Sequence, residues 1–89
     1  TAGYPDDIFN KVKKSLEMSG PGYIQILSPC IPGWGIKTDE AVEMGKLANQ
    51  GNVYPLLEYI NGELSTPIQK LDNFKDFEKK YYQKQKRFL

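Results

Sequence analysis

The single cysteine of this 89-residue sequence is the residue whose chemistry most needs an explanation. Cys30 lies in the segment GYIQILSPCIPGWG, residues 22–35, after a run of apolar residues and between two prolines. The sequence has no histidine, which removes both the commonest general base and the commonest zinc ligand.

Three roles for Cys30 are compatible with the residues around it. A lone cysteine is most often a small buried hydrophobic residue. A nucleophilic role is disfavoured because no histidine is available to activate the thiol. A role as cluster ligand would need thiolates from outside this sequence, since a four-iron cluster takes four cysteines. The position after a buried strand, where open α/β sheets place functional loops, favours the ligand.

Other side chains with possible chemistry have simpler explanations. Trp34 could stack on a ligand, but a hydrophobic lid over the cysteine loop is the better interpretation. The glycines around it form no phosphate-binding motif. Asp39, Glu40 and Glu43 are better explained by the positive end of a helix than by a metal. Tyr81 and its basic neighbours resemble a nucleic-acid surface, although aromatic packing explains them more economically, and we expect no nucleic-acid partner.

Composition and charge exclude several classes of protein. The length allows one small domain, and one cysteine allows no internal disulfide. No apolar run is long enough to span a membrane, and we expect a cytoplasmic protein. Residues 73–89 carry six basic and two acidic side chains, a net charge of +4. This end could meet an acidic partner or form a solvated helix face.

The elements that must position Cys30 begin with a helix and a strand. Pro5 and the two aspartates after it predict a helix start. Its expected apolar stripe consists of Ile8, Phe9, Val12 and Leu16. Residues 19–21 end this helix. Residues 23–27 are predicted to form a strand that is apolar on both faces and therefore covered on both sides.

The second half is predicted to contain a helix, a hairpin and a final helix. Thr38 is a suitable N-cap, and residues 51–52 end that helix. Its expected packing stripe consists of Ala41, Met44, Gly45 and Ala48. Residues 55–60 predict a strand, and Asn61-Gly62 predicts the turn of a hairpin. After an interruption at residues 65–67, the last helix should run from an Asn73 cap with Phe74, Phe77, Tyr81 and Phe88 on one stripe.

These elements predict the end of a larger α/β domain. A strand with two apolar faces needs neighbours that this sequence does not supply, and an isolated hairpin is marginal. The predicted segments are residues 1–37 (helix, strand and cysteine loop), 38–64 (helix and hairpin) and 65–89 (linker and helix).

Three separated motifs carry a family resemblance: GYPDDIFNKVKKSLEMSGPGYIQILSPCIPGWG, then AVEMGKLANQGNVYPLLEYINGE, then YYQKQKRF. Together they resemble the C-terminal part of the β subunit of 2-oxoacid:ferredoxin oxidoreductases, with pyruvate:ferredoxin oxidoreductase (pyruvate synthase) as the best match. The family's loop usually reads Pro-Cys-Pro-Thr-Gly-Trp, whereas here Ile31 and Pro32 follow Cys30.

The resemblance implies a fragment of a thiamine-diphosphate-binding α/β domain whose diphosphate and Mg²⁺ motif lies outside this sequence. It implies that Cys30 is one ligand of a [4Fe–4S] cluster whose other ligands also lie outside it. The whole enzyme would oxidatively decarboxylate a 2-oxoacid, form an acyl-CoA and pass electrons to ferredoxin. Its partners would be the rest of the β subunit and the other subunits. We expect the isolated chain to be inactive and to bind neither cofactor.

A competing hypothesis is a non-enzymatic interaction module. Its basic, aromatic C-terminal helix would dock a partner, and Cys30 would simply be buried.

Overall fold

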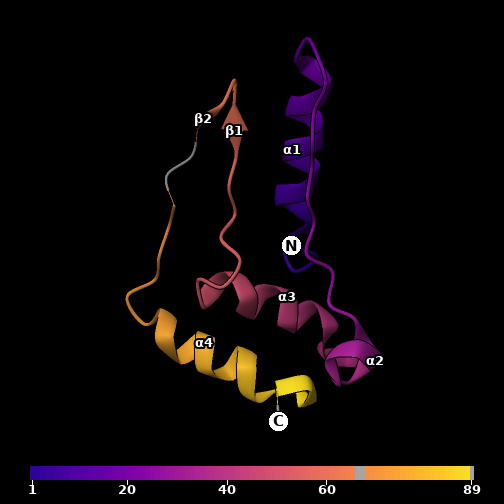
Figure 1. Cartoon of the computed structure of the whole chain (residues 1–89), viewed down its shortest axis with the longest axis vertical. Helices are drawn as coiled ribbons and strands as arrows, with labels where there is room; N and C mark the ends of the chain where they lie inside the picture. Colours follow the sequence, from indigo (N-terminus) through magenta and orange to yellow (C-terminus); the bar gives the residue numbers. More distant parts are fainter. Residues whose placement is uncertain (66–67, 89) are drawn as a thin grey trace.

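The computed structural model describes residues 1–65 and 68–88. The elements in chain order are α1 (Pro5–Glu17), α2 (Ile31–Trp34), the 3-10 helix η1 (Thr38–Glu40), α3 (Ala41–Gln50), β1 (Tyr59–Ile60), β2 (Glu63–Leu64), α4 (Phe74–Gln83) and the 3-10 helix η2 (Lys86–Phe88). Figure 1 shows α3 and α4 together at one end, with α1 and the β1–β2 hairpin projecting from it in the same direction. No helix in these two ranges is long and apolar enough to cross a membrane.

The chain is more elongated than a domain of its length would normally be. Its radius of gyration is 14.5 Å, and its principal extents are 45 × 29 × 19 Å. A compact chain of this length is expected to have a radius of gyration of about 12 Å. The excess arises because α1 and the hairpin extend away from the packed end (Figure 1).

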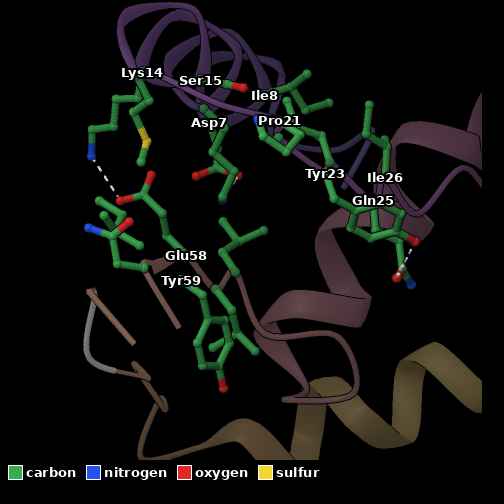
Figure 2. Close-up of a pocket in the computed structure, with 18 of the residues that line it drawn as sticks. Asp7, Ile8, Lys14, Ser15, Pro21, Tyr23, Gln25, Ile26, Glu58 and Tyr59 are labelled. Atoms are coloured by element: carbon green, nitrogen blue, oxygen red, sulfur yellow. Dashed lines mark hydrogen bonds and ion pairs between the residues drawn. The ribbon is translucent and has the colours of Figure 1, made fainter. Parts of the chain in front are cut away.

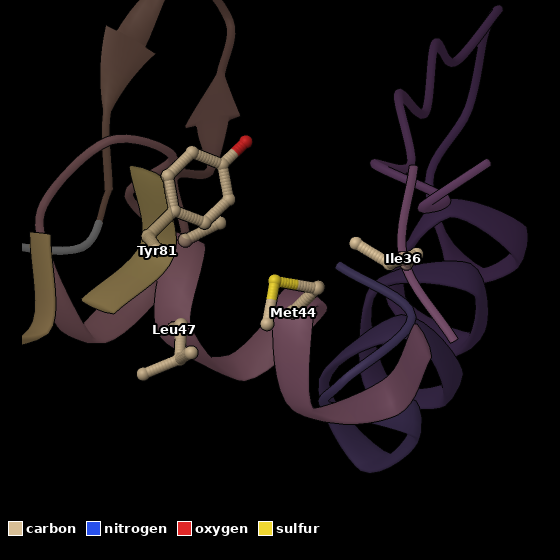
Figure 3. Close-up of a cluster of buried hydrophobic side chains, with 5 residues drawn as sticks. Ile36, Met44, Leu47 and Tyr81 are labelled. Atoms are coloured by element: carbon tan, nitrogen blue, oxygen red, sulfur yellow. The ribbon is translucent and has the colours of Figure 1, made fainter. Parts of the chain in front are cut away.

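The hydrophobic core lies where α3 meets α4 (Figure 3). The buried apolar side chains among the described residues are Ile36, Met44, Leu47, Ala48 and Tyr81. The small-residue stripe predicted for the second helix is therefore largely confirmed, since Met44, Gly45 and Ala48 are all buried.

Gly45 also brings the start of the chain close to α3. A Cβ on Gly45 would lie 2.7 Å from the backbone nitrogen of Gly3, so a side chain at this position would clash with the backbone. The buried Thr1 hydroxyl donates a hydrogen bond to the Gly45 carbonyl at 2.9 Å. These contacts attach the segment before α1 to the packed end.

Helix α1 begins at Pro5, as predicted, but its apolar stripe is not buried. Phe9 is 67% exposed and Leu16 is 82% exposed. Ile8 is half-buried where it lines the space facing residues 21–26 and 54–61, whereas Phe9, Val12 and Leu16 are exposed.

The segment predicted as a buried strand, residues 23–27, is extended but forms no ladder among the described residues. The prediction of burial is wrong within this chain, because Tyr23 is 86% exposed and Ile26 is 44% exposed. One backbone contact anchors the end of the segment, where the Ala2 N–H donates to the Leu27 carbonyl at 2.9 Å. A strand with two apolar faces needs layers on both sides, and the described residues place only α1 along it (Figure 1).

The hairpin predicted at Asn61-Gly62 is confirmed. Both turn residues have positive φ, 53° at Asn61 and 81° at Gly62, as a two-residue hairpin turn requires. The register pairs Tyr59 with Leu64 and Ile60 with Glu63. The strand predicted over residues 55–60 is wrong in extent, since only its last two residues pair.

Of the two predicted helix caps, one is wrong and the other is confirmed in position only. Thr38 does not cap α3, because it begins the 3-10 helix η1, whose Glu40 carboxylate accepts the Lys37 N–H at 3.2 Å. Asn73 is the N-cap residue of α4, as predicted, but its side chain makes no capping hydrogen bond.

The C-terminal helix is shorter than predicted. Helix α4 ends at Gln83, and the chain then forms η2. Tyr81 is buried, but Phe88 lies beyond the helix and is 50% exposed, so the predicted four-residue stripe is not one face. Of the interruption predicted at residues 65–67, residues 66–67 lie outside the described residues.

Candidate functional site

Cys30 lies at the N-cap of α2, so the predicted loop is a short helical turn. The Gly33 N–H donates to the Cys30 Sγ at 3.4 Å, and the Trp34 N–H donates to the Cys30 carbonyl at 2.8 Å. Pro32 occupies the first turn, where a missing N–H costs nothing. The cysteine is therefore held by the backbone of its own turn, with its side chain exposed.

Two glycines suit this geometry, and the second is the more constrained. A Cβ on Gly33 would lie 3.0 Å from the Cys30 sulfur, at the lower limit for such a contact. Gly35 ends α2 with φ of 67°, and a Cβ there would lie 2.6 Å from the Lys86 Cβ. The first glycine leaves space beside the sulfur, and the second allows the C-terminal segment to approach.

The C-terminal segment packs directly on α2, although more than fifty residues separate them in the sequence (Figure 1). The Arg87 guanidinium carbon lies 3.9 Å from the centroid of the Trp34 ring. The Trp34 ring in turn meets Tyr81 edge to face, with centroids 6.1 Å apart. The Lys86 N–H donates to the Gly35 carbonyl at 3.4 Å. The first and last of the sequence motifs therefore form one structural unit.

Gln85 is the polar centre of this unit, and sequence reasoning missed it. Its side chain is fully buried. The side-chain amide donates to the Tyr81 carbonyl at 2.8 Å, and its oxygen accepts Arg87 Nε at 2.6 Å. Arg87 also reaches the Tyr81 hydroxyl, with Nη2 at 3.4 Å. A buried amide satisfied on both sides holds its partners in place, because losing either bond would leave a buried polar atom unpaired.

The structure also places Trp34 and the acidic residues near the start of α3. Trp34 is half-buried against Tyr81, in agreement with a lid over the turn. The Lys84 ammonium lies 3.0 Å from a Glu43 carboxylate oxygen and 4.0 Å from one of Glu40. Within residues 1–65 and 68–88, no group of three or more potential ligand side chains could hold a metal ion by itself.

A separate cavity of about 760 Å³ lies between α1, residues 21–26 and residues 54–61 (Figure 2). The Lys14 ammonium spans it to the Glu58 carboxylate at 3.0 Å. This hydrogen bond, with another from the Ser65 hydroxyl at 3.0 Å, lowers the pKa of Glu58 below its usual value. The cavity is an open space between the two projecting arms, away from α2.

No family model matches the chain, but known proteins do. The PorB subunit of pyruvate synthase from Methanosarcina barkeri is 42% identical over 86 residues, which is 97% of this chain and 28% of that protein. The PorB subunit from Methanocaldococcus jannaschii is 47% identical over 60 residues, 67% of this chain and 20% of that protein. The VorB subunit of ketoisovalerate oxidoreductase from Pyrococcus furiosus is 45% identical over 60 residues, 67% of this chain and 19% of that protein.

The chain belongs to the family of these PorB and VorB subunits. This confirms the family resemblance found in the sequence, and the relatives are subunits of oxidoreductase enzymes. The chain spans 19–28% of the length of these curated relatives. Most of a PorB or VorB subunit therefore has no counterpart in it.

Proposed function

We propose that this chain is part of the β subunit of a 2-oxoacid:ferredoxin oxidoreductase, and that Cys30 supplies one thiolate ligand of its [4Fe–4S] cluster. The substrate class is a 2-oxoacid, with pyruvate as the first candidate because several relatives are pyruvate synthases. The reaction would convert the 2-oxoacid and coenzyme A to an acyl-CoA and carbon dioxide. The electron pair released would pass to ferredoxin.

The observation that carries the proposal is the exposed Cys30 sulfur on a backbone-fixed turn. The chemistry of this donor fits the cofactor, since four-iron clusters are held by cysteine thiolates. One cysteine can supply one of the four, and the sequence contains no second one. When bound, the cluster would accept and donate single electrons, and thiamine diphosphate with Mg²⁺ would serve the decarboxylation elsewhere in the enzyme.

The residues around Cys30 suit this role in two ways. The Gly33 N–H aimed at the sulfur would stabilise negative charge on a thiolate, and hydrogen bonds to ligand sulfurs are among the factors that set cluster potentials. The helical turn and Pro32 fix the backbone, so that little reorganisation would accompany a change of charge at the sulfur.

The same proposal accounts for the exposed apolar surface of α1 and residues 23–27. We assign these surfaces to contacts with the rest of the β subunit, in which residues 23–27 would take their place in a sheet. The relatives are three to five times longer than the stretch matched here, so they have additional chain to cover such surfaces.

The test is Cys30→Ala in the complete subunit, assembled with its partner subunits and purified without oxygen. We expect the cluster to be lost or to degrade to a three-iron form, because one ligand is missing. Iron content and the EPR spectrum of the reduced enzyme measure this. Ser28→Ala, two residues earlier at another exposed position, is the matched control. It should keep the iron content and the EPR spectrum of the parent. Full iron content and an unchanged spectrum in Cys30→Ala would exclude the ligand role.

A further inference from the structure

We infer that Arg87 is the positioning residue for Cys30: stacked on Trp34 and held by Gln85 and Tyr81, it fixes the α2 turn that presents the sulfur. This inference rests on the proposed ligand role of Cys30. It adds a function for the C-terminal residues, which lie outside the cysteine motif in the sequence.

Trp34 links Arg87 to Cys30 through its ring on one side and its backbone N–H on the other. The guanidinium carbon lies 3.9 Å from the Trp34 ring centroid, within the range of a cation–π contact. The backbone N–H of the same tryptophan donates to the Cys30 carbonyl at 2.8 Å. Trp34 therefore connects the guanidinium to the turn that carries the sulfur.

Arg87 is itself restrained, so that it can act as a fixed support. Its Nε donates to the buried Gln85 oxygen at 2.6 Å, and Nη2 reaches the Tyr81 hydroxyl at 3.4 Å. Tyr81 is 3% exposed and belongs to the core. The guanidinium is thus held by Gln85 and Tyr81 in addition to its contact with Trp34.

The chemistry of the contact requires arginine specifically. A planar guanidinium can stack on an indole and donate sideways to an amide and a hydroxyl at the same time. A lysine at the same position would keep the positive charge, but it has neither the plane for stacking nor the fork of donors. The variant Arg87→Lys therefore distinguishes the effect of the stacking geometry from that of the positive charge.

The experiment compares Arg87→Ala, Arg87→Lys and the control Lys79→Ala in the assembled, iron-loaded enzyme. Lys79 is an exposed basic residue of α4 that belongs to neither α2 nor η2. Two quantities are measured without reference to turnover: the rate at which a chelator removes iron, and the midpoint potential of the cluster followed by EPR.

We expect iron loss to be at least roughly tenfold faster in Arg87→Ala, corresponding to about 1.4 kcal/mol of lost restraint, with an altered potential and EPR line shape. Arg87→Lys should be close to Arg87→Ala, since it loses the stack, and Lys79→Ala should match the parent. Circular dichroism verifies that each variant is folded. If Arg87→Ala fails to fold, the comparison of Arg87→Lys with the parent decides.

The two proposals can fail separately. If Cys30→Ala loses the cluster while both Arg87 variants keep the parent's release rate and potential, the positioning role is wrong and the ligand role stands. If Arg87→Lys behaves like the parent while Arg87→Ala does not, positive charge alone is responsible and the stacking geometry is refuted. If Cys30→Ala keeps its iron, both proposals are overturned.

Discussion

Gly35 offers the sharpest test of the contact between the cysteine turn and the C-terminal segment. It ends α2 with φ of 67°, and a Cβ built there would lie 2.6 Å from the Lys86 Cβ. Gly62 in the hairpin turn has a similar φ of 81°, but a Cβ there would meet no atom within 4 Å. Alanine at both positions therefore creates the same backbone strain but different steric overlap.

The expected loss of stability follows from backbone strain and from steric overlap. A left-handed backbone costs a residue with a Cβ roughly 1–2 kcal/mol, which is the whole effect expected for Gly62→Ala. At Gly35 the overlap with Lys86 adds a term of the size of overpacking, about 1–3 kcal/mol. Gly35→Ala should therefore destabilise by roughly 2–5 kcal/mol in total.

The assay is thermal unfolding of the complete subunit at one fixed scan rate, with the parent and both variants side by side. The double variant Gly35→Ala/Lys86→Gly removes the overlapping atom and should recover part of the loss, after correction for Lys86→Gly alone. Equal effects of Gly35→Ala and Gly62→Ala, or no recovery in the double variant, would show that the C-terminal segment does not press on the turn.

Two further predictions concern the core and the cavity. Phe77→Ala should lower the stability of the assembly more than Lys80→Ala, because Phe77 packs on the core whereas Lys80 is exposed; equal unfolding midpoints would refute this. The hydrogen bond from Lys14 is the main cause of the lowered pKa of Glu58. This interaction therefore stabilises the fold fully at pH values above the pKa that Glu58 has in the unfolded chain. The stabilisation is lost as the pH falls through the pKa of Glu58 in the folded chain. The stability difference between the parent and Glu58→Gln should accordingly shrink from neutral pH to about pH 3, and a constant difference would contradict it.

Local sequence signals predicted the elements whose causes are local. Pro5 with its aspartates marked the start of α1, and Asn61-Gly62 marked the hairpin, because dipole and turn preferences act within a few residues. The stripe around Met44 predicted the packed face of α3, because apolar periodicity is a direct consequence of burial.

The predictions from the sequence are wrong where the structure depends on contacts between residues that are far apart in the sequence. The strand character of residues 23–27 was inferred from two apolar faces, but pairing needs neighbours that the described residues do not provide. Gln85 was missed because a glutamine among basic residues carries no signal of burial. Only the approach of η2 to α2 makes it a buried amide between Tyr81 and Arg87.

The distribution of packing along the chain bears on how Cys30 can be held. Residues 23–26, upstream of the cysteine, are exposed and have no ladder among the described residues, whereas Leu27 packs against the core and accepts the Ala2 N–H at 2.9 Å. Further restraint comes from the other side of α2, where Arg87 and the Lys86 backbone contact Trp34 and Gly35. A ligand whose geometry must change little with charge is better served by contacts to a packed core than by an exposed extended segment. For this reason we include the last described residues of the chain in the structural unit of the cysteine, although the sequence places them more than fifty residues away.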